Sequence, residues 1–145
     1  MNKLYGILDT ARDPKLYPLL IQSPLYDCLF AGKLAEPIKR TAPYLVELTD
    51  DTPLKNIWRD EGWGKAWGLL VKSDLDLKDL RRHLRKFLLA QLPDGEMVLF
   101  RFYDPRVWRQ YWPTCTPAEQ AEWMKGIEEF IPEDELQPKP DAAAP

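Results

Sequence analysis

The sequence predicts a single α/β domain of the α+β kind, in which helices pack against a mixed β-sheet that includes a β-hairpin. The chain has 145 residues, 45% hydrophobic and 30% charged, which suits one domain around one hydrophobic core. Short apolar segments typical of strands alternate with amphipathic segments typical of helices, and this order favours helices layered on a sheet. Residues 1–131 are expected to form the domain, and residues 132–145, rich in proline and alanine, a disordered tail.

Four short apolar segments predict the strands that precede the hairpin. They are Leu4–Leu8, Tyr26–Phe30, Tyr44–Leu48 and Ala66–Val71. Asp13 followed by Pro14 predicts the start of a helix, and Thr49–Pro53 predicts a second helix that continues to about Glu61. Residues 33–43 contain two prolines and predict an irregular connection.

The longest predicted helix covers residues 75–86, begins at a cap formed by Ser73 and Asp74, and leads into the hairpin. Leucines recur in it at three- and four-residue spacing, which indicates a core-facing stripe. The hairpin spans about residues 87–103, with strands at Phe87–Leu92 and Met97–Tyr103. The turn between them holds Gly95, which can adopt the positive φ that such turns need.

Two further helices follow the hairpin. Asp104 before Pro105 predicts the first of them. Thr116, Pro117 and Glu119 predict the second, because a threonine followed three residues later by glutamate can form a capping box.

Composition excludes several classes of function. The net charge of −3 provides no basic field for nucleic acid or an anionic membrane, and no apolar run is long enough to span a bilayer. No secretory signal is visible at the N-terminus, so a cytoplasmic location is expected. Cys28 and Cys115 lie far apart and are expected to stay reduced, and one histidine, His83, cannot build a multi-histidine metal site. We therefore expect no metal, no cofactor and no catalytic nucleophile.

Aromatic residues are abundant, and this abundance favours recognition over catalysis. The chain holds six Trp, six Tyr and five Phe. Most of these rings can simply fill the core, but some tryptophans can form an apolar patch that a partner covers. The candidates for a surface position are Trp58, Trp63, Trp108, Trp112 and Trp123.

The densest charge feature is basic and lies on the longest predicted helix. It comprises Lys78, Arg81, Arg82, Arg85 and Lys86. One interpretation is a solvated face whose cations complement the negative end of the helix dipole. The other is a docking face for an acidic partner, formed by Lys78, Arg81 and Arg82.

Phe100–Arg106 is the most unusual segment, since two arginines flank one aspartate in it. Alternation along a strand would place Arg101 and Tyr103 opposite Phe100 and Phe102. Asp104 with Arg101 and Arg106 can form a planar ion-pair cluster at a strand-to-helix corner. An enzymatic interpretation would make Asp104 a general base, but no nucleophile, metal ligand or phosphate loop accompanies it.

Glycines alternate with two tryptophans in the segment Gly62–Gly68. The spacing matches neither a dinucleotide fingerprint nor a P-loop, and the segment leads into a predicted strand. We expect these glycines to let the chain turn tightly past the indoles of Trp63 and Trp67.

The order of motifs resembles the domain of unknown function found in type VI secretion adaptor chaperones, the Tap or TEC proteins. The matching stretches run in order along the chain: Leu4–Asp9, Ala42–Leu48, Gly62–Gly64 with Trp67 and Gly68, His83–Lys86, and Phe100–Val107. The resemblance covers roughly the first 130 residues, and the last stretch is its most specific part.

The resemblance implies a cytoplasmic, non-enzymatic adaptor that binds a toxic effector and loads it onto the VgrG spike. It implies that the signature polar residues hold the central corner of the fold and border the binding groove; they are Arg85, Arg101, Tyr103, Asp104 and Arg106. Many members carry a further helical lobe, whereas this sequence ends in a proline–alanine stretch, so a different or smaller client surface is expected.

Two alternatives remain open at this point. The first is a regulatory module that docks an acidic partner through the basic helix 78–86. The second is a small enzyme or anion-binding domain that uses the arginine–aspartate cluster. The oligomeric state is open as well, because an apolar groove without its client can self-associate.

Overall fold

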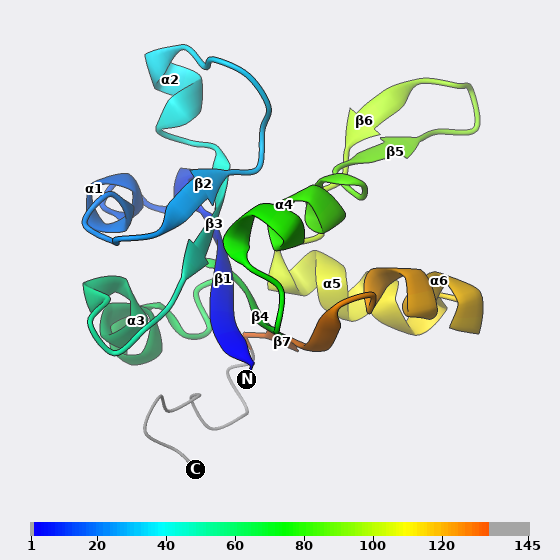
Figure 1. The fold of residues 1–145 in the computed structure, drawn as a ribbon. Coiled ribbons are helices and arrows are strands. Elements are labelled where there is room, and N and C mark those ends of the chain that lie inside the picture. Colours follow the sequence, from blue (N-terminus) through cyan, green and yellow to red (C-terminus); the bar gives the residue numbers. More distant parts are fainter. Residues whose placement is uncertain (1, 134–145) are drawn as a thin grey trace.

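A five-stranded β-sheet forms the centre of the molecule in a computed structural model that describes residues 2–133 (Figure 1). The strand order is β2-β3-β1-β4-β7, so β1 is central, β3 and β4 flank it, and β2 and β7 lie at the edges. The strands are β1 (Lys3–Asp9), β2 (Tyr26–Cys28), β3 (Pro43–Glu47), β4 (Gly68–Ser73) and β7 (Ile127–Pro132). A separate two-stranded hairpin is formed by β5 (Leu89–Gln91) and β6 (Met97–Leu99).

Helices cover both faces of this sheet. In Figure 1, α1 and α3 lie on one side of the strands, and α4, α5 and α6 lie on the other. The helices are α1 (Leu16–Leu20), α2 (Glu36–Lys39), α3 (Pro53–Ile57), α4 (Leu77–Arg85), α5 (Pro105–Tyr111) and α6 (Pro117–Trp123). A π-helical turn, Trp58–Gly62, follows α3, and short 3₁₀ turns η1 (Thr10–Arg12) and η3 (Trp112–Thr114) follow β1 and α5.

Alternation along the strands divides the core into two clusters. Tyr5 and Ile7 of β1 join the cluster under α4, α5 and α6, whereas Leu8 joins the cluster under α1 and α3. Strand β4 alternates in the same way, because Leu69 belongs to the first cluster and Leu70 to the second. The sheet is thus buried on both sides, as the apolar character of its central strands predicts.

The predicted fold class is confirmed: the chain is a single α+β domain with a sheet, a hairpin and helices packed on the sheet. The sheet, however, is antiparallel in every described pair and not mixed. The order strand–helix–strand misled the prediction because a helical connection need not place the next strand beside the last. After β1, the chain forms β2 at one edge and reaches the neighbour of β1 only with β3.

Several predicted boundaries need correction. Residues 33–43 contain the short helix α2 as well as irregular chain, and α4 is capped by Asp76, whose carboxylate accepts from the Asp79 amide at 2.8 Å. Strand β6 ends at Leu99, so the alternation predicted for the following residues is wrong. Phe102 and Tyr103 lie in a turn, and both are fully buried.

Strand β7, like α2, is an element that the sequence did not predict. The predicted domain ended at residue 131, but β7 pairs with β4 as far as Pro132, and Glu133 beyond it is buried. Leu70 pairs with Ile131 and Leu69 with Pro132 in this register. The tail predicted for 132–145 is therefore wrong at Pro132 and Glu133, and its other residues lie outside those that the structure describes.

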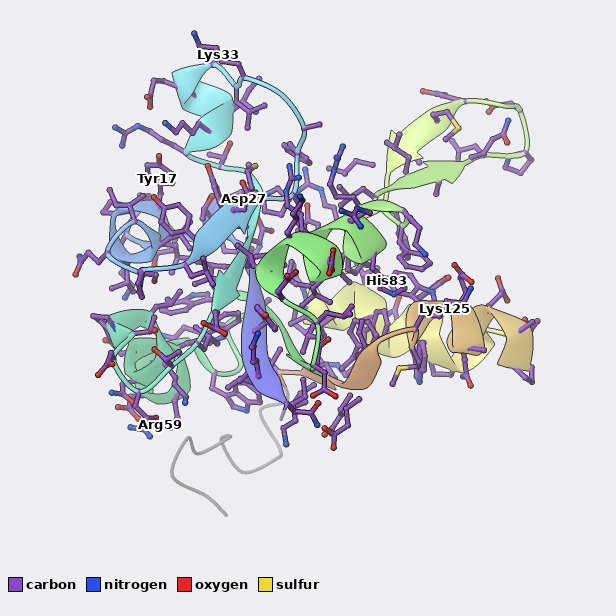
Figure 2. All side chains as sticks on the ribbon, in the orientation of Figure 1. Tyr17, Asp27, Lys33, Arg59, His83 and Lys125 are labelled. Atoms are coloured by element: carbon purple, nitrogen blue, oxygen red, sulfur yellow. The ribbon has the colours of Figure 1, made fainter. Side chains whose placement is uncertain are left out.

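His83 predicts a pH-dependent stability. Its ring is buried against α6, its Nε2 lies 2.8 Å from the carbonyl oxygen of Trp123, and burial lowers its pKa (Figure 2). Because the folded pKa lies below the unfolded value of about 6.5, the unfolded chain takes up the proton first. We expect the contribution of His83 to the free energy of unfolding to be constant above pH 7 and to fall as the pH drops through about 6.5.

The test measures the free energy of unfolding in urea, for the parent chain and for His83→Gln, between pH 7.5 and pH 5.5. Glutamine keeps an N–H donor for the Trp123 carbonyl but does not titrate in this range. The variant is expected to lose less stability on acidification than the parent chain. Parallel pH profiles would assign the loss to other groups.

Candidate functional site

A polar corner lies where the end of β1 approaches the N-terminus of α5. It consists of Asp9, Arg101, Tyr103, Asp104 and Arg106, which act on one another electrostatically. Asp9 and Tyr103 are buried, whereas Arg101 and Arg106 are exposed. The structure therefore brings together four of the five signature polar residues predicted from the sequence.

Asp104 is the cap of α5 and the ion-pair partner of Arg106. Its Oδ1 accepts from the Arg106 amide at 2.9 Å and from Nε at 3.0 Å, and its Oδ2 accepts from Nη2 at 2.7 Å. Partial burial opposes ionisation of Asp104, but the hydrogen bonds from Arg106 outweigh it and lower the pKa. This bidentate geometry fixes the corner. The sequence predicted an ion-pair cluster of Asp104 with both Arg101 and Arg106, but among the described residues only Arg106 forms that pair.

Asp9 and Tyr103 form the buried side of the corner. Burial raises the pKa of Tyr103 to about 12, and the nearby charge of Asp9 acts in the same direction. Burial also raises the pKa of Asp9, although the Ala11 amide donates to its carboxylate at 3.1 Å. The Tyr103 hydroxyl has no hydrogen-bond partner within the described chain. Tyr103 is fully buried and Asp9 is nearly so, and this side of the corner is therefore closed to solvent.

Arg85 does not belong to the corner. It is exposed in the last turn of α4, and its side chain forms no hydrogen bond or ion pair within residues 2–133. Its positive charge at the C-terminal end of α4 complements the negative end of the helix dipole, which agrees with the interpretation as a solvated face.

The predicted basic docking face is divided by the structure. Arg81 is turned toward β2: its Nε donates to the Cys28 carbonyl at 2.6 Å and lies 3.4 Å from Asp27 Oδ2. Arg82 forms an exposed ion pair with Asp79 at 3.3 Å, and Lys78 is exposed. Arg81 thus attaches α4 to an edge strand, which leaves Lys78 and Arg82 on the surface.

Gly62 and Trp67 confirm the predicted close approach of glycine to an indole. A Cβ at Gly62 would lie 2.2 Å from the Trp67 ring, so only glycine fits there. Trp67 is buried in the core cluster under α1 and α3, and Trp63 packs against the same cluster while remaining half-buried. These two predicted site residues support the fold and lie in the other core cluster from Tyr103.

Glu133 is the buried polar group that sequence reasoning missed. Its carboxylate accepts from four N–H donors at 2.8–3.0 Å: Trp58 Nε1 and the amides of Gly64, Ala66 and Gly68. Burial raises its pKa, although all four donors favour the charged form. Nη1 of Arg109 also donates to the Glu133 carbonyl oxygen. Glu133 thereby fastens the end of β7 to the Gly62–Gly68 segment.

Most of the tryptophans proposed for the surface lie in the core. Trp58, Trp108 and Trp123 are at most 3% exposed, so these three candidates do not lie at the surface. Trp63 and Trp112 are half-buried. The Trp123 ring packs against the rings of Phe87, Phe102 and Trp108. These contacts bury the apolar area that the tryptophans would otherwise expose to water.

Exposed apolar side chains gather on the β5–β6 hairpin, which we call the arm (Leu89–Leu99). Six large apolar side chains are exposed in residues 2–133, and three belong to the arm: Leu89 at 61%, Leu92 at 40% and Met97 at 53%. The arm projects from the body beyond the end of α4 (Figure 1). Neither strand of the arm contains a charge or a proline, the residues that usually protect an open strand edge.

A pocket of about 270 Å³ lies where the arm meets the body. Phe87, Phe100, Tyr111 and Trp123 form its apolar wall, and Leu89 of the arm borders it. An apolar side chain of a partner fits this volume, while the open edges of the arm offer main-chain hydrogen bonds to an added strand.

The described part of the chain shows neither of two other kinds of site. No helix in residues 2–133 combines the length and apolar character that crossing a bilayer requires. Among the same residues, no three His, Cys, Asp or Glu side chains gather in an arrangement able to hold a metal ion.

Comparison with known proteins identifies the family of the chain. No curated protein and no solved structure matches it significantly. The model of one family, described as a domain of unknown function (DUF4123), matches residues 4–122, which include the polar corner, the arm and the Gly62–Gly68 segment. The chain therefore belongs to the DUF4123 family.

Proposed function

We propose that this chain is a non-enzymatic cytoplasmic adaptor that binds a type VI secretion effector and helps to load it onto the VgrG spike. The motifs that resemble the adaptor chaperones support the proposal at the level of the family. The observation that carries it is the arm, because exposed Leu89, Leu92 and Met97 on a projecting hairpin are typical of a protein-binding surface.

Physical chemistry favours a partner on the arm. A two-stranded hairpin is marginally stable in water, and a third strand would satisfy main-chain groups along its open edge. Leu89 pairs with Leu99 and Gln91 with Met97, so Leu89 and Met97 lie on the same face of the arm. Both side chains on this face are exposed to solvent. An effector segment that covers this face would remove that apolar area from water.

The test is affinity capture from cells with an active type VI secretion system, with bound proteins identified by mass spectrometry. The tagged chain is expected to recover one large effector or VgrG. Leu89→Asp with Met97→Asp is expected to reduce recovery at least about tenfold, because hot-spot apolar contacts carry most binding energy. Ile38→Asp is the matched control, since Ile38 is 50% exposed on α2, away from the arm.

A folded arm variant that recovers the client as well as Ile38→Asp does would overturn the role of the arm. A parent chain that recovers neither an effector nor VgrG would overturn the adaptor proposal itself. Circular dichroism and a thermal melt establish that each variant is folded before capture is compared.

A further inference from the structure

A second surface feature lies at the opposite edge of the sheet from β2, along strand β7. A groove of about 390 Å³ runs between β7 and the segment α5–η3. We call it the tryptophan groove; its apolar residues include Trp108, Trp112, Met124 and Phe130, and its acidic residues are Glu128 and Glu129. It shares no lining residue with the pocket at the base of the arm.

The groove has an aromatic wall. The rings of Trp108 and Trp112 are stacked, with centroids 4.9 Å apart and an interplanar angle of 19°. The Phe130 ring lies 4.6 Å from Trp108 and 6.3 Å from Trp112. Trp108 is buried, whereas Trp112 and Phe130 are half-buried and so offer surface to a ligand. The electron-rich faces of such rings attract cations.

Carboxylates lie beside this aromatic wall. Glu128 and Glu129 are exposed on β7, and the Glu128 side chain has no hydrogen-bond or ion-pair partner within residues 2–133. Glu129 makes a long contact of 3.9 Å with Lys72. Arg109 also lines the groove, and its guanidinium donates to the Glu133 carbonyl oxygen at the end of the sheet. Because that acceptor is neutral, Arg109 keeps its positive charge, which the two carboxylates of the groove outnumber. The groove thus combines aromatic faces with a free carboxylate.

Strand β7 supplies an open edge next to the same groove. It pairs with β4 on one side and with no described strand on the other. Its two glutamates disfavour pairing with a neutral or acidic strand and favour a basic one. An extended basic segment can therefore lie along β7 and place a side chain in the groove.

We propose that the tryptophan groove binds an arginine side chain on an extended basic segment of a partner protein. Arginine fits better than lysine because its planar guanidinium stacks on aromatic faces and pairs with a carboxylate at the same time. The inference rests on the proposed function only in that the partner is a protein, and it assigns that partner a contact separate from the arm.

The test uses short peptides and the full ¹⁵N-labelled chain, so it requires no effector. Ac-Gly-Arg-Gly-Arg-Gly-NH₂ is titrated while the indole N–H resonances of the six tryptophans are followed. Two matched peptides replace arginine with citrulline, its neutral isostere, and with norleucine. The arginine peptide is expected to shift the Trp112 resonance and to bind about tenfold more tightly than the citrulline peptide.

Two variants test the groove residues. Trp112→Leu keeps an apolar side chain but removes the aromatic face. In this variant the arginine peptide is expected to cause no shift of the Trp108 indole resonance, the one indole resonance that remains in the groove. Glu128→Gln is expected to weaken binding of the arginine peptide about threefold. Glu96→Gln is its matched control, since it removes an exposed carboxylate from the turn of the arm.

Equal binding of the arginine and citrulline peptides would overturn the proposal, and so would tighter binding of the norleucine peptide, which would identify an apolar docking site. Absence of any shift at millimolar peptide would also overturn it. None of these results depends on the arm or on capture of an effector, so failure here is distinguishable from failure of the proposed function.

Discussion

Glu133→Ala is expected to lower the free energy of unfolding by about 3 kcal/mol, because it leaves four N–H donors without an acceptor in a buried place. The donors are Trp58 Nε1 and the amides of Gly64, Ala66 and Gly68, all within 3.0 Å of the carboxylate. Glu133→Gln is expected to cost nearly as much. A glutamine places an NH₂ group opposite two of these donors, where the carboxylate offers an oxygen.

Urea unfolding followed by circular dichroism measures both effects. Glu129→Ala is the control, because Glu129 is exposed and makes only a long contact with Lys72; its cost is expected to be below about 0.5 kcal/mol. A loss at Glu133→Ala no larger than that of the control would show that Glu133 does not hold β7 in place.

The elements that the sequence predicted correctly are those with a local cause. The capping box at the start of α6 is present, with Glu119 N donating to Thr116 Oγ1 at 3.1 Å and Thr116 N donating to Glu119 Oε1 at 2.8 Å. The hairpin turn places Gly95 at φ +89°, as the prediction required. In both places, residues within four positions of one another decide the structure.

Strand β7 and Glu133 were missed because their partners are distant in sequence. Glu133 binds groups 65–75 positions before it. The sequence of β7 contains two adjacent glutamates and a proline, and it shows no alternation that predicts a strand. The segment is extended because it forms hydrogen bonds with β4. No local signal in the sequence predicts this contact, because the Gly64 and Ala66 amides reach Glu133 from a turn in which both residues have a positive φ.

The candidate site was predictable as a set of residues but not as a geometry. Asp104 and Arg106 are two positions apart at the start of a helix, so their pairing followed from local spacing. Arg81 was assigned to a docking face because the sequence carries no sign that the Cys28 carbonyl, 53 positions away, lies within its reach. The tryptophans were misplaced for the same reason, since burial depends on which elements meet.

Trp123→Ala is expected to lower the free energy of unfolding by about 4 kcal/mol, the usual cost of deleting a buried indole. Its ring is stacked on Phe87 at 3.7 Å and meets Phe102 and Trp108 edge-on at 5.0 and 5.1 Å. Its Nε1 donates to the Tyr111 hydroxyl at 3.1 Å. Trp123→Phe keeps much of the apolar volume and loses that hydrogen bond, so a smaller cost of about 1–2 kcal/mol is expected.

Trp112→Ala is the matched control in urea unfolding, because Trp112 is only half-buried at the edge of the same aromatic cluster. If Trp112→Ala costs as much as Trp123→Ala, the indole of Trp123 is not the centre of that cluster.

Hydrogen exchange adds a second readout, since Trp123 forms part of the pocket at the base of the arm. Exchange of the Ala90 and Val98 amides should accelerate more in Trp123→Ala than exchange in β1, because the cavity opens beneath the arm while β1 keeps both neighbouring strands.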